Sequence, residues 1–86
     1  MDINNLIAII KKKLINQNII EQIKVEDKSF LHKNHSGHQE GKFHLKLIIE
    51  SNQLKKMSRI ESNKKIYKIL DQEIKQYIHS LQILIS

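Results

Sequence analysis

The first segment of the chain carries apolar residues at helical spacing. They recur every three or four positions, at Ile3, Leu6, Ile7, Ile10 and Leu14. This spacing places them on one face of an amphipathic helix. Asp2 precedes the pattern and is a residue type that caps helices. Asn16 or Asn18 can end the helix, because asparagine tolerates the left-handed backbone conformation. We therefore predict a helix that starts after Asp2 and ends near Asn16.

Three other segments alternate between apolar and polar residues, as half-buried strands do. The first lies within residues 19–26, where Ile23 and Val25 face one way. The second spans residues 42–50, and its apolar positions are Phe43, Leu45, Leu47 and Ile49. The third closes the chain, with Leu81, Ile83 and Ile85 as its apolar positions. We predict three short strands, of which the first two pair antiparallel.

The segment between the first two predicted strands has no period. Residues 27–41 contain both glycines of the chain, Gly37 and Gly41. A loop of roughly 15 residues is long for a compact domain, and such loops often carry function. Because it offers few apolar anchors, we expect this loop to be mobile in the isolated protein and to become ordered on binding a ligand.

A capping box marks the start of a longer helix. Ser58 and Glu61 stand at the spacing at which each side chain can satisfy a backbone amide near the other. An apolar stripe follows, which predicts a helix from about Ser58 to Lys75. Residues 51–53 should end the strand of residues 42–50. The whole chain, residues 1–86, then forms one α+β two-layer domain with helices on one face of a three-stranded sheet.

Composition narrows the classes of function. The 86 residues include no cysteine, which excludes a disulfide framework and a thiolate metal site, and the net charge is +6. The apolar runs, at most five residues long, are too short to span a bilayer. We expect a small, soluble, cytoplasmic protein. Its lysine-rich surface is either merely solvated or a nucleic-acid face, whose candidate residues are Lys55, Lys56, Arg59, Lys64, Lys65 and Lys68.

The histidines are the main candidates for chemistry. Of the five in the chain, His32, His35 and His38 lie in the long loop and His44 lies on the second strand. Imidazole is a common metal ligand, and three histidines would suit a zinc site, but this spacing matches no compact zinc motif. His79 is in phase with the apolar positions of the last strand, which predicts a partly buried histidine that donates to a backbone carbonyl.

An enzymatic site finds little support in the sequence. The chain has no cysteine nucleophile, no nucleotide-binding glycine loop and no H-E-x-x-H motif. Asp27, Ser29 and His32 supply the residue types of a hydrolytic triad. They lie within one loop, without the rigid framework that catalysis requires. We expect the protein not to be an enzyme.

Several short motifs follow one another in the order found in BolA proteins. The stretch VEDKSFLHKNH, residues 25–35, resembles the V-x-D-x-S strand end and H-x-x-H loop of that family. Residues 43–45 resemble its Ser/Thr-His-Phe triplet, and residues 66–67 its valine-tyrosine pair on the long helix. Residues 78–81, with the sequence IHSL, resemble its [IV]-H-A-L motif. The resemblance spans nearly the whole chain.

The resemblance implies a class II KH-like fold with the order αββααβ, and a partner role in iron–sulfur trafficking or sensing. BolA proteins share a 2Fe–2S cluster with a monothiol glutaredoxin and its glutathione. By position the resemblance assigns the cluster ligands to His79 and His32, with His35 as an alternative loop ligand, and gives His44 a structural role. Histidine ligation raises a cluster's reduction potential relative to thiolate. The isolated protein should then be a monomer or weak dimer without a cofactor.

The alternative that the family suggests is a KH-like DNA-binding transcriptional regulator. KH domains grip the nucleic-acid backbone with a G-x-x-G loop, and this chain has none. Lys56 stands where the family commonly has glycine, and residues 62–64 replace its Arg-His-Arg. These departures favour the cluster-sharing role over DNA binding.

Overall fold

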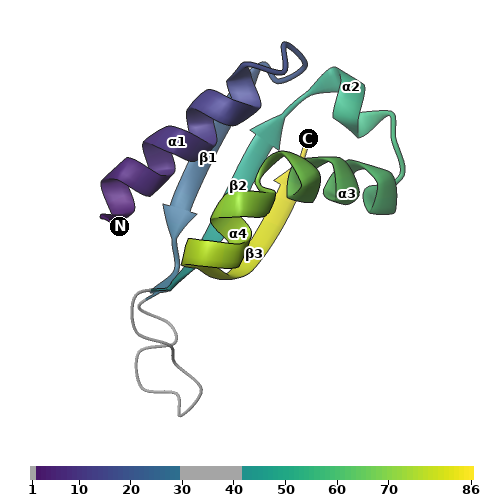
Figure 1. Cartoon of the computed structure of the whole chain (residues 1–86). Helices are drawn as coiled ribbons and strands as arrows, with labels where there is room; N and C mark the ends of the chain where they lie inside the picture. Colours follow the sequence, from purple (N-terminus) through teal and green to yellow (C-terminus); the bar gives the residue numbers. More distant parts are fainter. Residues whose placement is uncertain (1, 30–41) are drawn as a thin grey trace.

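The computed structural model describes residues 2–29 and 42–86. Its elements are α1 (Ile3–Ile15), β1 (Gln22–Asp27), β2 (Phe43–Glu50), α2 (Asn52–Lys55), α3 (Arg59–Ile69), α4 (Asp71–Tyr77) and β3 (Ile78–Ile85). Figure 1 shows α1, α3 and α4 on the same side of a three-stranded sheet. The predicted α+β architecture is confirmed. In the described part of the chain, every helix is too short or too polar to cross a membrane.

The sheet has the order β1-β2-β3, with β2 in the centre. β1 pairs antiparallel with β2, from Gln22 opposite Glu50 to Asp27 opposite Leu45, as predicted. β3 runs parallel to β2. The three helices between β2 and β3 provide the crossover that a parallel pair needs. Both β1 and β3 are therefore edge strands of the described sheet.

The core lies between the sheet and the helices. Alternate positions of β2 are fully or almost fully buried, as their spacing predicts, and three positions of α1 pack against them. These residues are Leu45, Leu47 and Ile49 of β2 and Leu6, Ile10 and Leu14 of α1. The intervening residues Lys46 and Ile48 are only half-buried. In the part of the chain that the structure describes, helices thus cover one face of the sheet and leave the other open.

The ends of α1 differ in part from the expectation. Asp2 occupies the cap position, but its side chain makes no capping hydrogen bond. Asn18 has a φ of 59°, in the left-handed region that asparagine tolerates better than most residues. The turn after α1 therefore uses Asn18 as expected, while the start of the helix depends on burial of its apolar face.

The single helix expected from Ser58 to Lys75 is broken in the structure. Ser58 does cap α3, and its Oγ accepts a hydrogen bond from the Glu61 amide at 3.1 Å. The helix then ends at Leu70, which has φ −100° and ψ 16° and is fully buried. The break keeps Leu70 in the core while α4 turns so that Tyr77 leads directly into β3.

The segment after β2 was expected to be irregular and instead forms the short helix α2. Its cap is Ser51, whose Oγ accepts a hydrogen bond from the Leu54 amide at 3.1 Å and donates one to the Ile19 carbonyl. Ser51 is completely buried, so this hydroxyl must be satisfied by protein groups. It joins the end of β2 to the turn before β1.

Candidate functional site

A β-bulge lies where β2 and β3 begin to pair. Phe43 pairs with Ile78 and His44 pairs with Ser80, so His79 is an extra residue on β3. Bulges disrupt the local ladder and are common beside functional sites, where they redirect a side chain. The bulge places His79, the histidine of the IHSL motif, at the end of the sheet.

The bulge also changes the expected environment of His79. Ile78 is buried and Leu81 is half-buried although three positions separate them, so the strict alternation is broken between them. His79 is exposed, and no other described residue hydrogen-bonds to its ring. The prediction of a partly buried histidine bonded to a carbonyl was wrong, because the extra residue takes His79 out of the core.

The ring of His44 lies next to the exposed imidazole of His79. Its ring centroid lies 4.9 Å from that of His79, with the two planes tilted by 60°. His44 is only 5% exposed, and its Nδ1 shares a hydrogen bond with Ser80 Oγ at 2.7 Å. A buried and hydrogen-bonded ring is positioned by the fold, so His44 provides a fixed surface beside the ring of His79.

The end of β1 fixes the backbone of His44. The Lys28 amide donates to the His44 carbonyl at 2.7 Å, and the His44 amide donates to Ser29 Oγ at 3.0 Å. The Ser29 amide in turn donates to Asp27 Oδ1 at 2.9 Å. Asp27 and Ser29 therefore serve as turn and strand-pairing residues. This arrangement differs from that of a catalytic triad.

Glu26 forms a small ion-pair cluster on the same strand. Lys28 Nζ lies 3.5 Å and Lys24 Nζ 3.6 Å from its carboxylate oxygens. Desolvation alone would raise the pKa of the Glu26 carboxyl, but Lys28 and Lys24 outweigh it and its pKa lies below the ordinary value. The lysines thus favour the ionised carboxylate at this end of the sheet.

The predicted loop ligands cannot be placed beside His79. His32, His35 and His38 lie outside the described residues, and so does most of the loop whose ordering we predict. Over residues 2–29 and 42–86, no group of three or more His, Cys, Asp or Glu side chains could hold a metal ion. His79 would therefore need further ligands from the loop or from another molecule.

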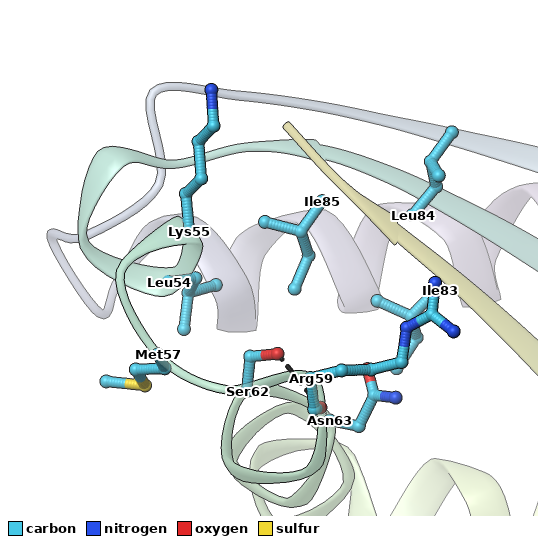
Figure 2. Close-up of a pocket in the computed structure, with 9 residues that line it drawn as sticks. All are labelled: Leu54, Lys55, Met57, Arg59, Ser62, Asn63, Ile83, Leu84 and Ile85. Carbon is cyan, nitrogen blue, oxygen red and sulfur yellow. Dashed lines mark hydrogen bonds between the residues drawn. The ribbon is translucent and has the colours of Figure 1, made fainter.

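The predicted nucleic-acid residues are all exposed. Two of them, Lys55 and Arg59, line a hollow of about 190 Å³ between α2, the start of α3 and the end of β3 (Figure 2). The other four are not among its lining residues. The sequence identified these cations, but it did not predict that two of them would meet the C-terminal half of β3.

The sequence motifs include Ser29 and Ser80 but did not predict the contacts of these residues with His44. Ser29 and Ser80 hold the backbone and the ring of His44, and each lies far from it in sequence. The [IV]-H-A-L motif that residues 78–81 resemble has alanine at the position of Ser80, and alanine could not make this hydrogen bond to His44. The serine that stands in place of alanine next to His79 is the feature of the sequence that could have pointed to this hydrogen bond.

Comparisons with known proteins agree with the fold and the motifs. A profile of the BolA-like protein family matches residues 14–86. The BolA domain of SufE1 from Arabidopsis thaliana has a similar structure, with 29% sequence identity, a TM-score of 0.71, and 90% of this chain and 85% of that chain covered. BolA1 from Arabidopsis thaliana gives 22% identity and a TM-score of 0.71, covering 92% and 87% of the two chains.

A Bol-like protein from Babesia bovis has 16% identity and a TM-score of 0.66, covering 91% of this chain and 79% of that one. A comparison with curated protein sequences found no match. The structures of BolA1 and of the Babesia bovis protein support the fold alone, because their sequence identity to this chain is low. The family profile spans most of the sequence and includes both the His44 strand and the IHSL motif. The chain belongs to the BolA-like protein family.

Proposed function

We propose that the protein is a non-enzymatic partner of a monothiol glutaredoxin, with which it shares a 2Fe–2S cluster. The observation that carries the proposal is the exposed imidazole of His79, raised on a β-bulge and backed by the buried ring of His44. A cluster held between two proteins needs a ligand that the second protein can reach. An imidazole within the core would not meet this need.

The donor chemistry of the site fits the proposal. A neutral imidazole donates a lone pair from one ring nitrogen, and His79 is the exposed histidine among the described residues. His32 is the proposed second ligand and His35 its alternative, both from the segment that joins β1 to β2. When bound, the cluster would carry single electrons at a potential raised by histidine ligation.

The proposal can be tested with apo protein and a cluster-loaded monothiol glutaredoxin, mixed without oxygen. We expect the visible circular dichroism of the cluster to change as a heterodimer forms, with one cluster per pair. His79→Ala should abolish this change, and His79→Cys should restore a cluster with a different spectrum because thiolate replaces imidazole. Gln82→Ala, an exposed position on the same strand, serves as the matched control.

Two results would contradict the proposal. One is an unchanged glutaredoxin spectrum on addition of the wild-type protein. The other is a His79→Ala variant that is folded by amide chemical shifts and still gives the wild-type heterodimer spectrum. A comparison of His32→Ala with His35→Ala in the same assay decides which loop histidine completes the site.

DNA binding has less support as the main function. The exposed cations give a positive surface, but a G-x-x-G loop that would grip a nucleic-acid backbone is absent from the sequence. A general lysine surface binds nucleic acids weakly and without sequence preference, and its affinity falls steeply with salt. The positive residues around the hollow suggest a different kind of partner.

A further inference from the structure

Along the outer edge of β3, backbone N–H and C=O groups remain that no other described residue hydrogen-bonds. Ser86 donates its amide to the Ile49 carbonyl at 2.9 Å and accepts from the Ser51 amide at 3.0 Å, so it points toward β2. In a strand, the N–H and C=O groups of successive residues point alternately to the two edges. Since those of Ser86 point toward β2, the N–H and C=O groups of Ile85 and Ile83 point toward the free edge. Such an edge is a template for another strand.

A hydrogen bond further along β3 supports this direction. The Tyr67 hydroxyl of α3 donates to the Leu81 carbonyl at 3.3 Å, so the carbonyl of Leu81 also points away from β2. Tyr67 thereby covers the edge at Leu81. The open part of the edge starts after it, at Ile83 and Ile85.

The hollow described above forms a groove beside this open part of the edge. Its lining includes apolar side chains from α2, from β3 and from the segment between α2 and α3, and the described residues that line it include no carboxylate (Figure 2). These apolar residues are Leu54, Met57, Ile83, Leu84 and Ile85. Two cations accompany them: Lys55 at the end of α2 and Arg59 at the start of α3, which extends toward β3 in the figure.

We propose that this groove binds an extended acidic segment of a partner protein, which adds a strand to the free edge of β3. Strand addition draws affinity from main-chain hydrogen bonds and specificity from pockets for alternate side chains. The groove offers apolar contacts for one set of side chains and Lys55 and Arg59 for the carboxylates of the other set. A second copy of this chain would bring the same cations to the edge and is disfavoured by their repulsion.

The lining favours a polypeptide over a nucleic acid. Binding of single-stranded nucleic acids relies on aromatic side chains on which bases stack, and the described residues that line this groove include no aromatic one. An extended peptide instead offers both N–H and C=O groups at the spacing that the edge of β3 presents.

This proposal goes beyond the cluster-sharing function and does not depend on it. Ile83 and Ile85 lie four and six residues from His79 along β3, which corresponds to about 13–20 Å of extended strand. The groove and the histidine site therefore occupy different ends of the strand. Failure of one proposal leaves the other standing.

The test uses the full chain and a fluorescein-labelled peptide of roughly ten residues that alternates valine with glutamate. Fluorescence anisotropy at about 0.1 M salt measures its affinity, and hydrogen exchange followed by NMR reports on the amides of Ile83 and Ile85. We expect saturable binding and slower exchange at these two amides. The same peptide with alternate amides N-methylated should not bind, because it cannot pair with a strand edge.

Paired charge reversals test the role of the cations. The Lys55→Glu/Arg59→Glu variant should lose at least about tenfold in affinity, because like charges would then face each other in the groove. Lys11→Glu/Lys12→Glu changes the net charge equally at exposed positions of α1 and should lose less than about threefold. All four positions are exposed, so the variants should keep the fold.

Four results would overturn the proposal. Binding of the N-methylated peptide as tight as that of the parent peptide would exclude strand addition. An equal loss of affinity in the two double variants would reduce binding to an effect of net charge. Tighter binding of an oligothymidylate of similar length, with slower exchange at Ile83, would assign the groove to nucleic acid. Failure of the acidic peptide to bind at all would also refute the proposal.

Discussion

Removal of Lys13 should destabilise the fold much more than removal of a neighbouring lysine. Lys13 Nζ on α1 lies 2.6 Å from Glu73 Oε2 on α4. The Glu73 side chain is only 7% exposed, and its Oε1 is buried with no partner in the described part of the chain. In Lys13→Met this buried carboxylate would lose the cation that balances it.

The structure sets the size of the effect. Breaking a fully buried ion pair by removing one partner costs about 3–5 kcal/mol. The Lys13 side chain is 35% exposed, so water screens the pair in part. We therefore expect a loss of about 2–3 kcal/mol for Lys13→Met. For a domain of this size that is a fall of roughly 10–20 °C in Tm.

Urea unfolding followed by far-UV circular dichroism at pH 7 measures this loss. Lys12→Met is the matched control, because Lys12 is exposed on the same helix and should change stability by less than about 0.5 kcal/mol. The double variant Lys13→Met/Glu73→Met should recover most of the loss, since apolar residues often replace a buried pair without cost.

Two outcomes would refute this reasoning. Equal stabilities of Lys13→Met and Lys12→Met would mean that the Glu73 carboxylate does not need its cation. A double variant as unstable as Lys13→Met alone would mean that the loss of stability arises from lost packing of the lysine stem. The unpaired Glu73 carboxylate would then contribute nothing to it.

Two further predictions concern the core and the histidine site. Leu47→Ala should cost about 2–5 kcal/mol in urea unfolding, because Leu47 is fully buried in the central strand, while Ile48→Ala on the half-buried face should cost clearly less. Ser80→Ala should cost about 1 kcal/mol by removing the hydrogen bond to His44 Nδ1. The same variant should shift the ring resonances of His44 and His79 in NMR spectra and weaken cluster retention in the glutaredoxin assay, whereas unchanged ring resonances would contradict the positioning role of Ser80.

The sheet and the first helix could be predicted because their burial patterns are local. Alternation along β2 identified Leu45, Leu47 and Ile49 as core residues, and the helical period identified Leu6 and Leu14. These patterns predict which side of an element is buried, and the structure buries that side. The antiparallel pairing of β1 and β2 followed from their alternation and their order along the chain.

The break at Leu70 and the helix α2 could not be predicted in the same way. Leu70 continues the apolar stripe of a straight helix, yet its backbone leaves the helical conformation, and the following residues return to the sheet through α4 and β3. Ser51 looks like a strand breaker in sequence. Its role as a cap and as a donor to the Ile19 carbonyl depends on a turn far away in the chain.

The histidine site required information from both strands. The motif identified His79, but its exposure depends on the pairing of Phe43 with Ile78 and of His44 with Ser80. A bulge is a property of two strands together, so the period of β3 alone gave the wrong environment. The role of Ser29 is equally non-local, because its hydroxyl meets the amide of a residue fifteen positions away.

The cost of this local structure is itself an argument for a function at His79. A regular pairing of β2 with β3 would need no extra residue, and an apolar side chain at position 44 would bury without hydrogen bonds. The chain instead holds a bulge, a buried imidazole at 5% exposure and a hydroxyl to satisfy it, all at one end of the sheet. An 86-residue domain has little stability to spare for such features. Departures of this kind from the sequence that suits the fold best concentrate where side chains must be presented to something else. The side chain that these features leave exposed is the imidazole of His79.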